Sequence, residues 1–128
     1  MLSLMPALFS GLFAAADAET RLDAERWQTR PILVFAEADD PRLADQLSRL
    51  EADRAALAER QNVVIVDTLA HSLLRTRFRP EGFTVILVGL DGGEKFRETE
   101  VVDPDRLNAL IDAMPMRRNE LRRQGSAE

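Results

Sequence analysis

The fold is decided by the stretch at residues 31–42, which reads PILVFAEADDPR. Its first half, residues 31–36, is a continuous apolar run headed by a proline and stopped by acids, which is typical of a strand buried on both faces. Asp39 and Asp40 then precede Pro41, and an acidic cap followed by proline in the first turn is a helix start signal. The stretch therefore predicts a buried strand that turns directly into a helix.

The segments that follow repeat this alternation of strand and helix. Leucines recur at helical spacing up to Arg60, through a stretch without glycine or proline, which predicts one long helix. A second buried strand is predicted at residues 63–66, and a crossover helix between two such strands makes them parallel. Asp67 is expected to cap a shorter helix over about residues 70–78, with Leu73 on its inward side.

The remaining residues complete an α/β order of elements. A third strand is predicted at residues 83–89, and residues 91–93 form a tight hairpin into an antiparallel fourth strand at 94–97. Asp103 and Pro104 start a final helix that Pro115 interrupts, followed by a charged turn or two and a frayed end. The order βαβαββα predicts a thioredoxin-like fold with a four-stranded mixed sheet flanked by helices.

The amino-terminal residues predict export. Residues 2–16 form an apolar run too short to span a bilayer, and Ala16-Asp17-Ala18 then places small residues at the two positions that a signal peptidase reads. Residues 1–18 are therefore predicted to be a secretory signal peptide. Cleavage after Ala18 would leave one domain at 19–128, with a core at about 27–122, no integral membrane span, and a periplasmic or secreted location. A mis-assigned start codon or an amphipathic amino-terminal helix is the alternative.

Composition excludes several classes of function. The 128 residues suffice for one domain, and the net charge of −5 argues against nucleic acid as a partner because binding a polyanion needs a basic face. The chain has no cysteine, so it can form neither a thiolate metal site nor a thiol nucleophile. It also has no glycine-rich phosphate loop and no metal-ligand spacing, so neither a metal site nor a cofactor is expected.

Two resemblances agree with this order of elements. At residues 35–42 the chain resembles a thioredoxin at the turn that carries the redox motif, but Asp39-Asp40-Pro41-Arg42 replaces Cys-Gly-Pro-Cys. Thioredoxins open the third strand with a cis-proline followed by threonine, and the matching place here reads Phe83-Thr84, without the proline. The chain more closely resembles the bacterial family called domain of unknown function 4174. That resemblance implies a thioredoxin- or peroxiredoxin-like fold in exported bacterial proteins, with related domains in animal extracellular-matrix proteins and no established activity. It is carried by Arg30-Pro31, Phe35-Ala36, Asp40-Pro41-Arg42, Gly82-Phe83-Thr84-Val85, Gly89-x-Asp91-Gly92-Gly93-x-Lys95 and Ile111-Asp112-x-Met114-Pro115-Met116-Arg117-Arg118-x-Glu120.

Candidate binding residues fall at two places. Ligands of open α/β sheets bind outside the carboxyl ends of parallel strands, where acids follow the first two predicted strands. An arginine cluster near the carboxyl terminus has forked donors that suit a phosphate or an acidic partner, or it is only favourable charge at a helix end. Met114 and Met116 are either an adaptable contact surface or core filler. The candidate binding residues are Glu37, Asp39, Asp40, Arg42, Asp67, Phe83, Thr84, Arg117 and Arg118.

Two hypotheses of function follow. The first is a non-catalytic, thioredoxin-like binding or structural module of the cell envelope, whose partner is a protein or a small molecule. The second is an enzyme that uses the carboxylates at the sheet edge with a bound hard cation, since Ca²⁺ and Mg²⁺ prefer oxygen ligands. Those same acids serve equally well as helix caps, which is their more common role.

Overall fold

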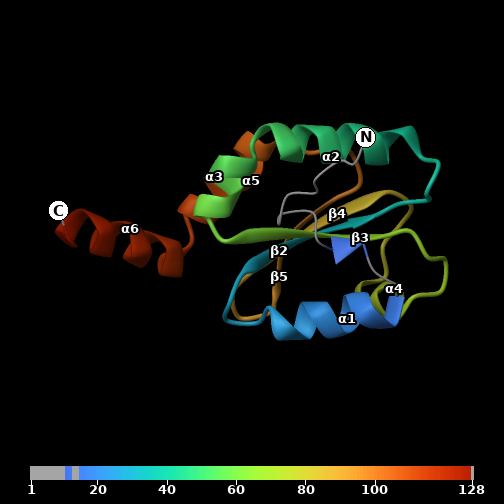
Figure 1. The fold of residues 1–128 in the computed structure, drawn as a ribbon, viewed down its shortest axis with the longest axis horizontal. Helices are drawn as coiled ribbons and strands as arrows, with labels where there is room; N and C mark the ends of the chain where they lie inside the picture. Colours follow the sequence, from blue (N-terminus) through green and yellow to red (C-terminus); the bar gives the residue numbers. More distant parts are fainter. Residues whose placement is uncertain (1–10, 13–14, 128) are drawn as a thin grey trace, which may run out of the picture.

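The computed structural model describes residues 11–12 and 15–127, and its centre is a mixed β-sheet with helices on both faces (Figure 1). The four predicted strands are confirmed, with β3 parallel to β2, and β4 antiparallel both to β2 and to β5. A two-residue strand, β1, pairs parallel with the outer edge of β3. The sheet order is β1-β3-β2-β4-β5, formed by β1 (Gly11–Leu12), β2 (Arg30–Phe35), β3 (Asn62–Asp67), β4 (Thr84–Val88) and β5 (Glu94–Glu98).

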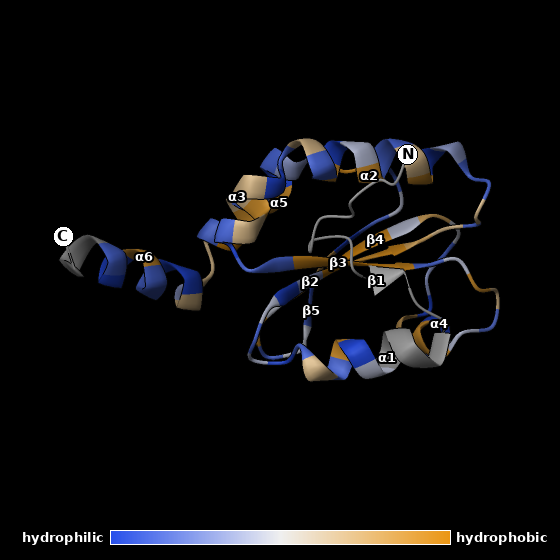
Figure 2. Cartoon of the chain, in the orientation of Figure 1, coloured by the Kyte–Doolittle hydropathy of each residue, from blue (hydrophilic) through white to orange (hydrophobic). Residues whose placement is uncertain are grey.

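Helices cover the two faces of the sheet in two separate apolar layers (Figure 1). On one face, Leu50, Leu57 and Leu107 pack against the strand residues that point toward them. On the other face, Leu74 and Phe78 pack against the alternate strand residues. Figure 2 shows the result as apolar central strands between helices whose outer sides are hydrophilic. The first layer contains α2 (Pro41–Ala52), α3 (Arg54–Glu59) and α5 (Pro104–Asp112), and the second contains α1 (Ala15–Ala24) and α4 (Leu73–Phe78).

The prediction that one unbroken helix runs to Arg60 is wrong in one respect. It breaks at Asp53, whose carboxylate accepts a hydrogen bond of 2.8 Å from the Asn108 side chain of α5. A short acidic side chain competes with helix hydrogen bonds and is disfavoured inside a helix. The break lets α3 turn so that Leu57 is fully buried in the core.

The short helix α4 also differs from its prediction. Its cap is Ser72, whose hydroxyl accepts a 3.0 Å hydrogen bond from the Arg75 backbone N–H, so Asp67 is not the cap. Because a residue at the cap starts the helix, α4 begins at Leu73 rather than near residue 70. Leu73 then faces outward with 52% of its surface exposed, and Leu74 and Phe78 alone face the core.

The two ends of the chain are more helical than expected. Helix α1 runs on to Ala24, past the predicted cleavage point after Ala18, and both β1 and α1 begin within residues 1–18, most of which lie outside the described residues. Helix α6 (Pro115–Ala127) continues past the predicted charged turns and projects away from the sheet (Figure 1). Among the described residues, no helix combines the length and apolar character needed to cross a membrane.

Candidate binding site

The carboxyl ends of β2 and β3 form the first place where binding was expected. A hollow of ≈ 570 Å³ lies there, and polar residues that include Glu37, Asp39 and Arg75 line it. Its volume is within the size range of ligand pockets. Asp40 and Asp67 do not join them. Within residues 11–12 and 15–127, no three histidine or carboxylate side chains lie close enough together to hold a metal ion. The arrangement that the cation-dependent enzyme needs is therefore not formed by Glu37, Asp39, Asp40 and Asp67.

Asp40 and Arg42 satisfy each other at the start of α2. The Asp40 carboxylate caps the helix by accepting a 2.9 Å bond from the Arg42 backbone N–H, and the Arg42 guanidinium donates back to both of its oxygens at 3.1 and 2.8 Å. These bonds from Arg42 lower the pKa of Asp40. Arg42 also lies 5.0 Å above the ring of buried Phe83. The prediction that Asp39 or Asp40 caps this helix is confirmed for Asp40.

Asp67 and Thr84 are buried and used internally. Asp67 accepts hydrogen bonds from the Ser72 hydroxyl and from the Leu69 backbone N–H, which fixes the loop that leads into α4. The Thr84 hydroxyl donates to the backbone carbonyls of Glu81 and Gly82 at the opening of β4. Neither side chain is available at this edge.

The predicted arginine cluster divides into one buried and several exposed side chains. Arg118 is exposed, whereas the side chain of Arg117 is only 2% exposed and contacts three carboxylates. Its guanidinium reaches Glu59 at 3.1 Å and Glu120 at 3.3 Å, and Glu120 also accepts a 3.1 Å bond from buried Arg30. Arg117 therefore fastens the first turns of α6 to α3 and α5, and it is not a free contact point.

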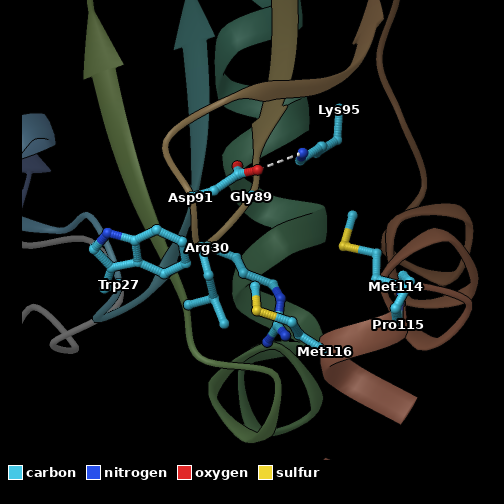
Figure 3. Close-up of a pocket in the computed structure, with 9 residues that line it drawn as sticks. Trp27, Arg30, Gly89, Asp91, Lys95, Met114, Pro115 and Met116 are labelled. Carbon is cyan, nitrogen blue, oxygen red and sulfur yellow. Dashed lines mark hydrogen bonds and ion pairs between the residues drawn. The ribbon is translucent and has the colours of Figure 1, made fainter. Parts of the chain in front are cut away.

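A second pocket lies at the opposite end of the sheet, where β2 begins and β4 ends. It has a volume of ≈ 420 Å³ and its wall is mostly apolar. Three distant segments form it, namely the loop before β2, the β4–β5 hairpin and the junction of α5 with α6 (Figure 3). The lining residues are Trp27, Arg30, Gly89, Leu90, Asp91, Lys95, Met114, Pro115 and Met116.

Trp27 stands at the mouth of this pocket in a strained conformation. Its φ is +65°, in the left-handed region that a bulky side chain rarely adopts, and 61% of its surface is exposed. The conformation is held by a 2.6 Å hydrogen bond from the Trp27 backbone N–H to the carbonyl of Leu90. Strained residues cluster at functional sites, so the exposed and strained Trp27 makes this pocket a candidate binding site.

Two glycines of the hairpin give room to two cations. A β-carbon on Gly89 would lie 2.5 Å from Cε of Lys95, and one on Gly92 would lie 2.7 Å from Nε of Arg26. Lys95 reaches across Gly89 to Asp91 at 3.0 Å (Figure 3). The backbone N–H of Gly93 and the Lys95 ammonium lower the pKa of Asp91, in that order of strength. The glycine spacing of this hairpin thus seats Lys95 and Arg26 beside the pocket.

Residues 66–120 match the family model described as "Domain of unknown function (DUF4174)". This match supports the family resemblance, and it extends from the end of β3 into α6. No match was found among curated proteins. Within the part that matches the DUF4174 model lie the hairpin and the Met114-Pro115-Met116 junction, which together form most of the pocket wall; Trp27 and Arg30 precede it.

The sequence prediction did not include Trp27, Lys95 or Asp91 among the candidate residues. For Met114 and Met116 the sequence allowed either a contact surface or a core-filling role. The structure places both in the pocket wall, with 40% of Met116 exposed. The available signal was the pair of motifs at 89–95 and 111–120, for which neither helix periodicity nor turn formation alone accounts.

Proposed function

We propose that the protein is a non-redox, thioredoxin-like binding module of the bacterial cell envelope, and that it binds a bulky apolar group in the Trp27 pocket. One observation carries this proposal: a strained and largely exposed tryptophan borders an apolar pocket, whereas Phe35, Phe78 and Phe83 are buried in the core. Ligand pockets are mostly apolar hollows with a few placed polar groups, which describes this one.

The contact points proposed from the sequence offer less to a ligand. The Asp40–Arg42 turn, proposed from the sequence as a contact point, satisfies its own charges, and Arg117 is occupied by three carboxylates. Without cysteine, thiol chemistry is excluded at the sheet edge that thioredoxins use. Binding at the other end of the sheet requires no such chemistry.

An uncharged apolar dye, phenylnaphthylamine, tests the pocket directly. Trp27 is the only tryptophan and the chain has no tyrosine, so energy transfer from tryptophan to the dye reports binding beside Trp27. We expect transfer in the parent protein and in Leu73→Ser, which removes an exposed leucine far from the pocket, and weaker transfer in Met116→Ser. Absence of transfer in the parent, or equal transfer in all three proteins, would overturn the proposal.

Export is proposed from the apolar run and the small residues that end at Ala18. The mature protein would then begin at Glu19. Intact mass of the protein recovered from the periplasm or the medium is expected to correspond to that start. Recovery of a chain that begins at Met1, in the cytosol only, contradicts this part of the proposal.

A further inference from the structure

The Trp27 pocket has a local charge opposite to that of the whole chain. Arg26, Arg30 and Lys95 lie in or beside it, against the carboxylates of Asp91 and Glu120, although the chain carries a net charge of −5. From this contrast we infer that the pocket selects an organic carboxylate, a ligand with an apolar body and one negative charge. The inference rests on the proposed function, because it names the ligand class for the same pocket.

The three cations have different roles, as their contacts show. Arg30 is fully buried at the base of the pocket and donates to the Arg60 carbonyl and to Glu120, each at 3.1 Å. Because both terminal nitrogens of Arg30 are bonded and its side chain is buried, it contributes positive potential rather than a ligand contact. The Arg26 side chain makes no hydrogen bond or ion pair with the described part of the chain, so its guanidinium is available to a ligand beside Gly92.

Lys95 is the cation best placed to bind a carboxylate. It lines the pocket, and within the described residues its only carboxylate partner is Asp91; the two side chains are 38% and 43% exposed. An ion pair this exposed contributes little stability. The ammonium can therefore exchange the Asp91 carboxylate for that of a ligand, or bind both, since it has three donors.

The apolar wall determines the other half of the ligand. Trp27 and the two methionines provide a polarizable and adaptable surface, which accepts aliphatic and aromatic bodies alike. An amine with the same body would meet Lys95 and Arg26 as like charges. A neutral alcohol would contact the apolar wall of the pocket but would form no ion pair with Lys95 or Arg26.

Octanoate, octanol and octylamine separate these cases because they share one apolar body. Titrations followed by the fluorescence of Trp27 should give the tightest binding for octanoate, roughly tenfold tighter than octanol, which is the scale of one hydrogen bond to a charged group. Octylamine should bind most weakly. In Lys95→Met, octanoate and octanol should bind alike, whereas the control Arg49→Met, an exposed arginine on α2, should keep the tenfold preference.

The outcomes distinguish this inference from the proposed function. If octanol or octylamine binds as tightly as octanoate, the pocket binds apolar groups but the inferred charge selection is wrong. If no member changes the fluorescence of Trp27, the pocket itself fails as a binding site. If octanoate binds as expected, a blocked tripeptide of two leucines and one glutamate identifies the source of the carboxylate. Tighter binding of the tripeptide than of octanoate indicates a partner protein, and weaker binding indicates a free carboxylate.

Discussion

Arg117 and Arg118 are neighbours in sequence with opposite roles, and replacing each with methionine separates those roles. Methionine keeps the length and much of the apolar stem of arginine but removes the charge. The Arg117 side chain is buried against Glu59, Asp112 and Glu120, whereas Arg118 is exposed. We expect Arg117→Met to destabilise the protein and Arg118→Met to leave it unchanged.

The size of the loss follows from the partners that remain. Removing one member of a buried ion pair costs about 3–5 kcal/mol when a buried charge is left alone. Here Glu120 keeps Arg30 at 3.1 Å, and Glu59, with 59% of its side chain exposed, returns to water. The expected loss for Arg117→Met is therefore lower, about 2 kcal/mol, against less than about 0.5 kcal/mol for the surface change Arg118→Met.

Urea unfolding with linear extrapolation measures both values. The buried role of Arg117 is refuted if Arg117→Met unfolds at the same urea concentration as the parent. An equal loss of unfolding free energy in Arg118→Met would show that Arg118 also contacts the rest of the protein, which contradicts its exposed position on α6.

Three further predictions concern other contacts. Asp40→Ala should lower the urea midpoint because it removes the cap of α2, while Asp39→Ala should not; equal midpoints would contradict the cap. Arg60 holds the pKa of Asp112 below its ordinary value of 3.8, so the stability from this pair is present above that value and lost as the pH falls through the lowered pKa. Unfolding free energy measured from about pH 5 to 2 should therefore fall less in Asp112→Asn than in the parent. Gly89→Ala should leave stability nearly unchanged, since the Lys95 and Asp91 side chains that the new β-carbon would displace are both partly exposed, but should reduce the preference for octanoate over octanol in the same fluorescence titration.

Much of the fold was predictable because its signals are local. Continuous apolar runs marked β2, β3 and β4, and an acid followed by proline marked the starts of α2 and α5. The break at Asp53 was not predictable, because it depends on Asn108 of another helix. The cap of α4 was misassigned because Asp67 and Ser72 both have the chemistry of a cap, and only the structure shows which one reaches the helix.

The candidate site was less predictable than the fold. Its wall joins residues 27–30, 89–95 and 114–116, whose proximity depends on the sheet order and on the angle of α6. The positive φ of Trp27 has no local signal, because tryptophan ordinarily avoids that region and tertiary contacts enforce it here. The sequence also does not show which of Arg117 and Arg118 is buried, since that depends on which face of α6 packs against the rest of the protein.

The position of the binding site is decided most directly by nuclear magnetic resonance of the protein during titration with octanoate. Binding in the Trp27 pocket predicts shifts of the Trp27 indole N–H and of the methyl groups of Met114 and Met116 that saturate together. Resonances of Glu37 and Arg75, at the carboxyl ends of β2 and β3, should not move. Saturable shifts confined to Glu37 and Arg75, or no saturable shift at Trp27, would contradict the assignment of the pocket as the binding site.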